Sequence, residues 1–238
     1  QALVVPYEQA LQEIAVRDYT HAYADEAIRA LEHFSEGIRC YVSTNEDQYG
    51  PFRIGPSYPL LYQEEVQIPK VPYAHNGGNQ ICFPMYNYDL AKAETLRYEI
   101  GRITRMRDLF RQGTQMLKGI EPALDGRRKE GIRRLIALGA FIWRSAQTTV
   151  HVKEWYLLKR ELQSGTGDRA DIIRRMRAIG KAEIENAEHT IPLAAYDSRL
   201  GFEPSMEYMT DRAHLEWKIA CTRRAMAELD SVTDGSSD

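Results

Sequence analysis

Apolar residues recur every three or four positions along most of the chain, which is the pattern of amphipathic helices packed against a core. In the last such segment the apolar stripe runs from Leu215 through Ile219 and Met226 to Leu229. The pattern predicts helices over about 6–16, 24–41, 89–119, 126–163, 168–190 and 210–229. Sustained alternation with a period of two is missing, and only residues 60–71 are a candidate for a short strand or hairpin. We therefore predict an all-α fold, a bundle of about six helices.

Polar residues and prolines mark the predicted helix ends. Asp89 and Asp168 suit the N-cap position, and Thr210 or Asp211 suits the start of the last helix, because their side chains accept hydrogen bonds from the first free N–H groups. Pro192 is expected to stop the fifth helix near residue 190, since proline lacks the N–H that a helix needs.

Two segments, 43–88 and 191–209, do not follow the helical pattern. Both are rich in tyrosine, and the first also holds six prolines and four glycines. Long irregular segments in compact domains are usually functional or disordered, and their aromatic content argues against disorder. We predict a single helical domain over 1–229 in which these segments form two long tyrosine-rich loops, followed by a flexible acidic tail at 230–238.

Composition narrows the class of protein. With 43% hydrophobic and 27% charged residues the chain is globular, and no stretch is apolar enough to span a membrane. The first residues lack the pattern of a signal peptide, and three cysteines far apart argue against a disulfide framework. Together these features favour a cytoplasmic location. No phosphate-binding, dinucleotide-binding or nucleophile-elbow motif occurs, so no cofactor is expected.

Charge is distributed unevenly. Residues 97–181 carry 20 basic and 9 acidic side chains, a net charge of +11, whereas residues 1–96 and 182–238 each carry −7. A basic middle can attract an anionic glycan or a nucleic acid. We expect instead that acidic and basic helices of the same chain neutralise each other, so a nucleic-acid partner is not predicted. The basic run 127–129 opens a helix, where the macrodipole disfavours cations, which indicates an acidic neighbour.

The irregular segments combine aromatic rings with planar polar groups, which is the composition of a carbohydrate site. Sugar rings stack on aromatic side chains, and their hydroxyls bond to carboxylates, amides and guanidinium groups. The candidate binding residues are Asp47, Tyr49, Arg53, Tyr58, Asp197, Arg199, Glu203 and Tyr208. On composition alone a structural explanation is favoured, in which the aromatics pin the loops to the helices and Asp197 and Arg199 bond within a tight turn.

Catalytic and metal-binding patterns are weak. Glycoside hydrolysis needs two facing carboxylates, and Glu46 with Asp47, or Glu203 with Glu207, are candidates, although nothing in the sequence shows that they face each other. Several Asp, Glu and His residues lie three positions apart on one helix face, at 18 and 21, 151 and 154, and 211 and 214. Such pairs are common on charged helices, so we interpret them as ion pairs or hydrogen bonds and predict no metal site.

The segments 45–60 and 181–219 resemble the C-terminal helical region of large glycoside-hydrolase-like proteins built around an alpha-glucuronidase-like or hexosaminidase-like (β/α) barrel, and TTVHVKEWY at 148–156 also fits. In that family the barrel carries the catalytic carboxylates, and the helical region packs against it. The resemblance implies a helical accessory domain that contributes loops to a glycan cleft or a domain interface. The implied partners are a glycan, a barrel domain or a second copy of the chain.

This chain has no alternating strand–helix pattern and is shorter than a barrel of ~250 residues, so we expect it to lack the catalytic barrel. No catalytic residue is assigned. Two alternatives stay open. The chain is a complete glycoside hydrolase using loop carboxylates such as Asp47 and Glu203, or it is a non-enzymatic interaction module that exposes its basic helices to an acidic partner.

Overall fold

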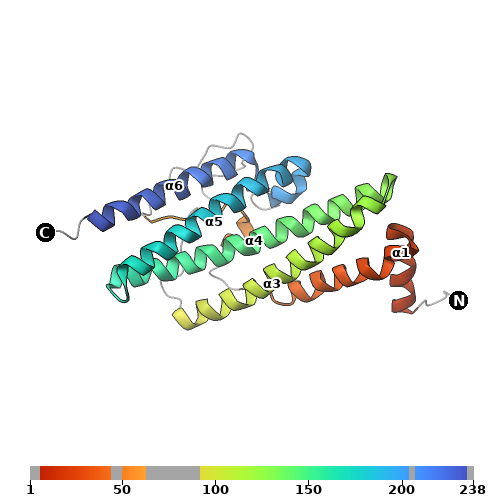
Figure 1. Cartoon of the computed structure of the whole chain (residues 1–238), viewed down its shortest axis with the longest axis horizontal. Coiled ribbons are helices and arrows are strands. Elements are labelled where there is room, and N and C mark those ends of the chain that lie inside the picture. The colour runs from red at the N-terminus through yellow and green to blue at the C-terminus, as the bar shows by residue number, and fades with distance from the viewer. Residues whose placement is uncertain (1–5, 44–49, 63–91, 204–206, 235–238) are drawn as a thin grey trace. The chain divides into compact units, whose positions relative to one another are not determined.

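The computed structural model describes residues 6–43, 50–62, 92–203 and 207–234. This part of the chain is almost entirely helical (Figure 1), and the prediction of an all-α bundle is confirmed. Its helices are α1 (Tyr7–Ile38), α2 (Pro51–Ile54), α3 (Ala93–Ile120), α4 (Gly126–Ser164), α5 (Arg169–Tyr196) and α6 (Arg212–Asp234). Shorter elements are the 3-10 turns η2 (Glu121–Ala123) and η3 (Ser198–Gly201) and the antiparallel strands β1 (Phe202–Glu203) and β2 (Glu207–Tyr208).

The chain divides into two compact units. Unit 1 comprises Gln1–Tyr41 and Arg105–Trp143, and unit 2 comprises Val42–Thr104 and Arg144–Asp238. The long helices α3 and α4 each contribute one part to unit 1 and the other part to unit 2. Each unit has a hydrophobic core of its own. That residues 1–229 form a single domain stays a prediction.

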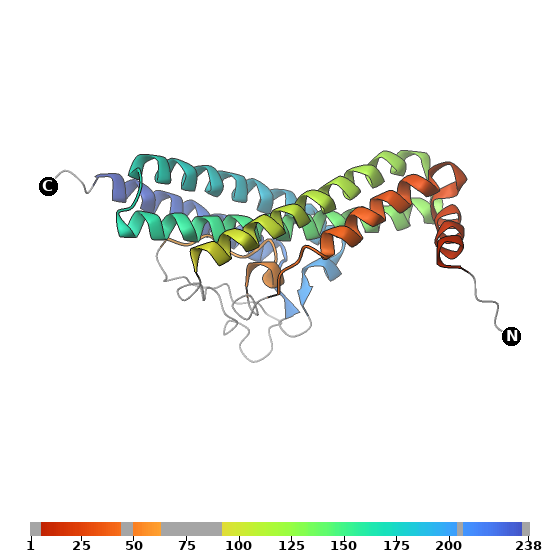
Figure 2. The same ribbon diagram turned by 90° about the horizontal axis from the view of Figure 1, so that it is seen from below.

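In unit 1, α1 consists of two arms that meet at a sharp bend (Figure 2). Thr20 has φ 68° and ψ 163° there, outside the helical region, and the arms on either side correspond to the two N-terminal helices that the sequence predicts. The second arm packs on α3 and α4 around Phe34. A Cβ atom on Gly113 or Gly139 would lie only 2.7 Å or 2.5 Å from the Phe34 ring, so both positions need glycine for this close approach.

In unit 2, α5 and α6 lie side by side (Figure 1). Trp155 of α4 is fully buried at the centre of the core, with Met176 of α5 and Leu229 of α6. Tyr58 and Leu60, from the predicted loop 43–88, belong to the same core. The described part of that loop is therefore an ordered layer on the helices.

Two of the predicted helix starts have the expected caps. The Asp168 carboxylate accepts a hydrogen bond from the Ala170 N–H at 2.9 Å, and Asp211 accepts one from the His214 N–H at 2.9 Å. Each aspartate satisfies an N–H group that the first helical turn leaves free. The sequence therefore located the starts of α5 and α6 for the correct physical reason.

Other boundaries differ from the predictions or cannot be compared. Asp89 and the residues beyond 62 in the candidate strand 60–71 lie outside the described residues. Residues 60–62 form no strand. At the C-terminus α6 continues to Asp234, so the first residues assigned to a flexible tail are helical.

The prediction that Pro192 ends α5 is wrong. The helix continues to Tyr196, and the segment predicted as a loop from residue 191 begins with a helical turn. Pro192 removes only the helical hydrogen bond to the Glu188 carbonyl, four residues earlier. Ile191 and Ala194 pack on Leu215 and its neighbours in α6. This packing outweighs the one hydrogen bond that proline removes.

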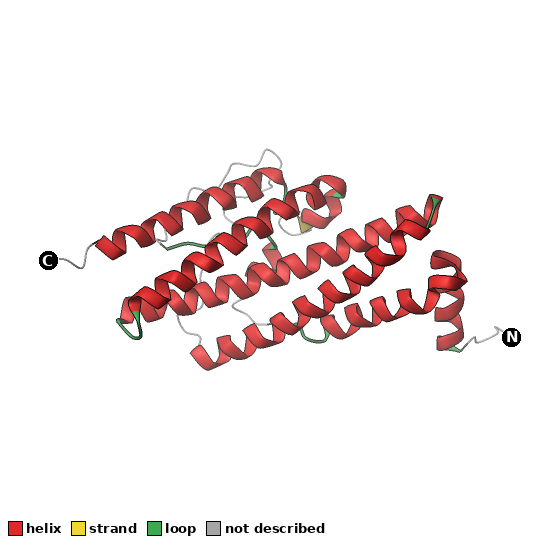
Figure 3. Ribbon diagram, in the orientation of Figure 1, coloured by secondary structure: helices red, strands yellow, loops and turns green. Residues whose placement is uncertain are grey.

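Overall, helices account for nearly all of the regular structure in the described residues, as Figure 3 shows by colour. No helix in this part of the chain combines the length and the apolar character needed to cross a lipid bilayer.

Candidate functional site

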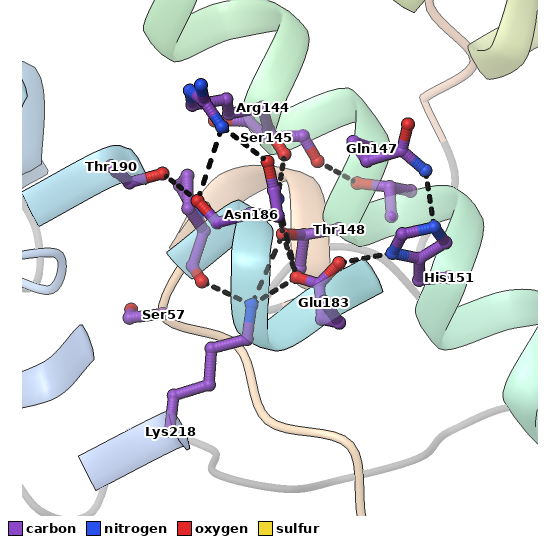
Figure 4. Close-up of polar contacts among 12 residues, drawn as sticks. Ser57, Arg144, Ser145, Gln147, Thr148, His151, Glu183, Asn186, Thr190 and Lys218 are labelled. Carbon is purple, nitrogen blue, oxygen red and sulfur yellow. Dashed lines mark hydrogen bonds and ion pairs between the residues drawn. The ribbon is translucent and has the colours of Figure 1, made fainter. Parts of the chain in front are cut away.

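A buried carboxylate, Glu183, lies at the centre of a polar cluster in unit 2 (Figure 4). Lys218 from α6 forms an ion pair with Glu183 Oε1, and the Thr148 hydroxyl from α4 donates to the same oxygen. His151 Nδ1, one helical turn further along α4, donates to Oε2. Neither Glu183 nor Lys218 has any side-chain exposure to solvent. Three helices thus meet at one carboxylate.

Helix geometry brings these side chains together. Thr148 and His151 are three residues apart on α4, and Glu183 and Asn186 are three residues apart on α5, so each pair shares a helix face. The Asn186 amide donates to Thr148 Oγ1 and to the Arg144 carbonyl, both at 3.1 Å. Its carbonyl oxygen accepts from Arg144 Nη1 at 3.2 Å. The cluster therefore fixes the register of α4 against α5.

His151 has a second polar contact on the same helix. The Gln147 side-chain amide lies 2.6 Å from Nε2, while Nδ1 contacts the Glu183 carboxylate. These two contacts fix the orientation of the ring between α4 and α5.

Electrostatics keep Glu183 ionised. Burial on its own raises the pKa of Glu183, but the charges of Lys218 and His151, together with their hydrogen bonds to the carboxylate, outweigh it and lower the pKa from 4.5 to about 2. For Lys218, burial lowers the pKa and Glu183 opposes that change. A carboxyl with so low a pKa carries no proton at neutral pH, so it does not serve as a general acid.

Lys218 also reaches the segment 50–62. Its ammonium group donates to the Pro56 carbonyl as well as to Glu183. Nearby, the Trp155 indole N–H donates to the Leu61 carbonyl at 2.9 Å, and the Thr210 hydroxyl donates to the Ile54 carbonyl at 2.9 Å. An irregular segment lacks the regular backbone hydrogen bonds of a helix or sheet, so its buried carbonyl groups need side-chain donors such as these. The cluster thus anchors the loop to the helices.

The two loop segments singled out in the sequence meet at this anchor. Ser57 Oγ lies 3.1 Å from Thr210 Oγ1 and donates to the Met209 carbonyl. The Met209 and Thr210 N–H groups both donate to the Gly201 carbonyl, at 3.0 Å and 3.2 Å. We call residues 50–62 and 197–210 together the loop layer. Residues 204–206 of this range lie outside the described part.

The predicted sugar-binding residues occupy different places in the loop layer. Tyr58 is 1% exposed, which leaves no ring face for a sugar, and Arg53 is half-buried in α2. Arg199 and Asp197 form a two-point ion pair, with Nε–Oδ1 2.8 Å and Nη2–Oδ2 2.6 Å. The Arg199 N–H also donates to Asp197 Oδ1 at 3.1 Å. The two residues therefore bond within the tight turn η3, which is the structural role that the sequence favours for them.

The remaining predicted residues are described in part or not at all. Glu203 lies in β1 and Tyr208 in β2, and only their backbone is described. Asp47 and Tyr49 lie outside the described residues, as does Glu46. The sugar-binding role of these residues stays a prediction.

Sequence reasoning missed Glu183 and Lys218. The signal is present, because both are charged residues at apolar positions of a helical stripe. Glu183 follows Met176 and precedes Ala187 at helical spacing, and Lys218 lies between Leu215 and Thr222 on the buried side of α6. A charge at such a position requires a buried partner. Which residue is that partner depends on how the helices pair.

The spaced acid–histidine pairs have diverse partners. His151 bonds to Glu183 on another helix, Asp18 pairs with Arg17, and His214 Nδ1 bonds to Asp211 at 2.8 Å. Among the described residues no group of three or more His, Cys, Asp or Glu side chains is arranged to hold a metal ion. A second buried ion pair joins Lys153 to Glu99 at 2.7 Å.

Comparison of the chain with protein-family models, with curated proteins and with solved structures finds no match. The chemistry of the site therefore has to be argued from its geometry. Glu183 and Lys218 have no side-chain exposure, and the side chain of His151 is 10% exposed. In the described structure these groups contact one another and the segment 50–62.

Proposed function

We propose that this chain is the non-catalytic helical accessory domain of a carbohydrate-active, glycoside-hydrolase-like enzyme, and that its loop layer contacts a glycan. The observation that carries the proposal is the anchor, in which Lys218 bridges the Glu183 carboxylate and the Pro56 carbonyl. Here a buried ion pair between two helices also holds an irregular loop in place, which suits a domain whose role lies in that loop.

The resemblance supports the same proposal. The segments that carry it, 45–60 and 181–219, are distant in the sequence, yet Ser57 and Thr210 are hydrogen-bond neighbours. Motifs that meet in one layer are easier to explain by a shared surface than as two separate features. The buried carboxylates Glu183 and Glu99 are each paired with a lysine, which supports a domain without catalytic carboxylates in its helices.

The loop layer offers aromatic surface for a sugar. Phe202 is 46% exposed, and Tyr196, at the end of α5 beside the layer, is 47% exposed. Large aromatic rings exposed next to polar groups favour stacking on the C–H face of a sugar. Arg199 lies between these two residues in the sequence, in η3, and has an exposed side chain.

A titration with matched variants tests this proposal. We expect neutral oligosaccharides to bind with a dissociation constant that survives moderate salt, and Phe202→Ala to weaken binding about tenfold, the equivalent of ~1.4 kcal/mol. Tyr98→Ala on α3 is the control, because Tyr98 is 64% exposed and is not one of the residues of the loop layer. Isothermal titration calorimetry gives both constants.

Three outcomes would contradict the proposal. Equal weakening by Tyr98→Ala would mean that aromatic surface in general is responsible. Binding only of acidic ligands that vanishes with salt would favour the interaction module. Hydrolysis of an oligosaccharide by the chain itself, abolished in Asp47→Asn or Glu203→Gln, would favour the complete hydrolase.

A further inference from the structure

A pocket of about 770 Å³ lies in unit 1, between the bend of α1 and the start of α4. Its lining includes three arginines, two aspartates and a tyrosine: Arg17, Arg127, Arg128, Asp18, Asp125 and Tyr19. The bend at Thr20 explains how the end of the first arm reaches α4, because its non-helical φ of 68° turns the chain directly after Tyr19. The pocket is separate from the loop layer and belongs to one unit.

Two of the arginines are held by the protein. Arg17 makes a two-point ion pair with Asp18, with Nε–Oδ1 2.7 Å and Nη2–Oδ2 2.9 Å. Arg128 Nε donates to the Arg17 carbonyl at 2.8 Å. Asp18 is thus an acidic neighbour of the basic run. Its hydrogen bond with Arg17 lowers its pKa most, burial raises it, and the charge of Arg128 adds a smaller lowering.

Arg127 differs from two arginines further along α4. Arg133 pairs with Glu121 at 2.7 Å and Arg134 pairs with Glu130 at 3.0 Å. Within the described part of the chain no carboxylate pairs with Arg127, although its side chain lines the pocket. A guanidinium group presents several N–H donors that match an oxyanion in two-point geometry.

The other wall of the pocket is less polar. Ile132 and Leu135 of α4 line it together with the ring of Tyr19. Burial first, and then the charge of Asp18, raise the pKa of Tyr19, so its phenol keeps its proton and stays a donor. The pocket therefore combines cationic N–H donors with an apolar wall.

We propose that this pocket binds the oxyanion of a small molecule, a carboxylate or a phosphate, with Arg127 and Arg128 on the anion and Tyr19 and Leu135 against the body of the ligand. This site is independent of the proposed function of the loop layer. A ligand seated here supplies a counterion for Arg127, whose guanidinium pairs with no carboxylate in the described part of the chain.

The test uses the full chain and two probes, inorganic phosphate and glucuronate, each titrated separately by NMR or calorimetry. We expect one of them to bind saturably at one site, and Arg127→Gln to weaken it about tenfold, as for loss of a charge-assisted two-point contact. Phosphate binding alone identifies a phosphate group as the ligand chemistry, and glucuronate binding alone identifies a carboxylate on a ring.

Arg134→Gln is the matched control, because it removes the same charge from the same helix at a residue that does not line the pocket. Equal weakening by both variants would overturn the proposal in favour of general attraction to a basic helix. Absence of saturable binding for both probes would also overturn it. Arg127 is exposed, so its variant should keep the melting temperature of the wild type, and Tyr19→Phe gives a second, charge-neutral check.

Discussion

A lysine and a glutamate without solvent exposure join α6 to α5 in unit 2. Removing the charges of such a pair from water is unfavourable, and the pair persists because every partner in the cluster contributes a hydrogen bond. Lys218 contacts Glu183, Thr148 and the Pro56 carbonyl at the same time. At the scale of single residues, Lys218 therefore connects α6 to α4, to α5 and to the segment 50–62.

We expect Lys218→Met to lower the free energy of unfolding by about 3–5 kcal/mol, because it leaves the Glu183 carboxylate buried without its cation. The double variant Lys218→Met, Glu183→Gln should recover a large part of this loss, since no charge is then left unpaired. Urea denaturation measures both values. Lys181→Met, at an exposed position of α5, is the control, and equal losses at 181 and 218 would refute the role of the pair.

Acid should destabilise the protein through Glu183. Its pKa falls from 4.5 in the unfolded chain to about 2 in the folded one, so the unfolded state binds more protons between these values. The stabilisation is complete above about pH 4.5 and is lost as the pH falls toward 2, by about 3 kcal/mol. The free energy of unfolding, measured by denaturation at several pH values across this range, should depend less on pH in Glu183→Gln than in the wild type. An equal pH dependence in the two proteins would contradict the assignment.

At the scale of elements, backbone contacts hold the loop layer as firmly as side chains do. A Cβ atom added to Gly201 would lie 2.1 Å from the Thr210 carbonyl oxygen, at the point where η3 meets the start of α6. The backbone there cannot give way without breaking the hydrogen bonds from Met209 and Thr210 to Gly201. The turn therefore requires glycine.

Gly201→Ala should lower the stability by about 1–3 kcal/mol through this overlap. Gly119→Ala on α3 is the matched control, because nothing lies within 4 Å of its added Cβ and alanine favours a helix. Thermal unfolding of the two variants should shift in opposite directions. A Gly201→Ala protein as stable as the wild type would mean that the loop layer is not held as described.

Several elements could be predicted from the sequence and others could not. The stripe of α4 and the caps at Asp168 and Asp211 are local signals, and the structure agrees with them. Pro192 misled because the packing of α5 on α6 overrides a local preference. The Glu183 cluster joins residues 148, 183 and 218, and only the pairing of three helices brings those positions together.

At the scale of the whole molecule, the features described above belong to two different units. Unit 2 holds the polar cluster and the loop layer, and unit 1 holds the arginine-lined pocket at the bend of α1. From the uneven charge along the sequence we expected acidic and basic helices to neutralise each other, and the arginines beside Tyr19 are the place where we propose an anionic ligand. The glycan and the oxyanion are thus separate proposals with separate variants.

The most direct measurement is amide hydrogen exchange, followed by mass spectrometry, with and without a neutral oligosaccharide at saturating concentration. The account predicts added protection confined to the loop layer, in peptides covering 50–62 and 197–210, while α3 and the exposed face of α4 stay unchanged. Protection confined to unit 1, or none anywhere despite measured binding, would contradict the claim that the loop layer contacts the glycan.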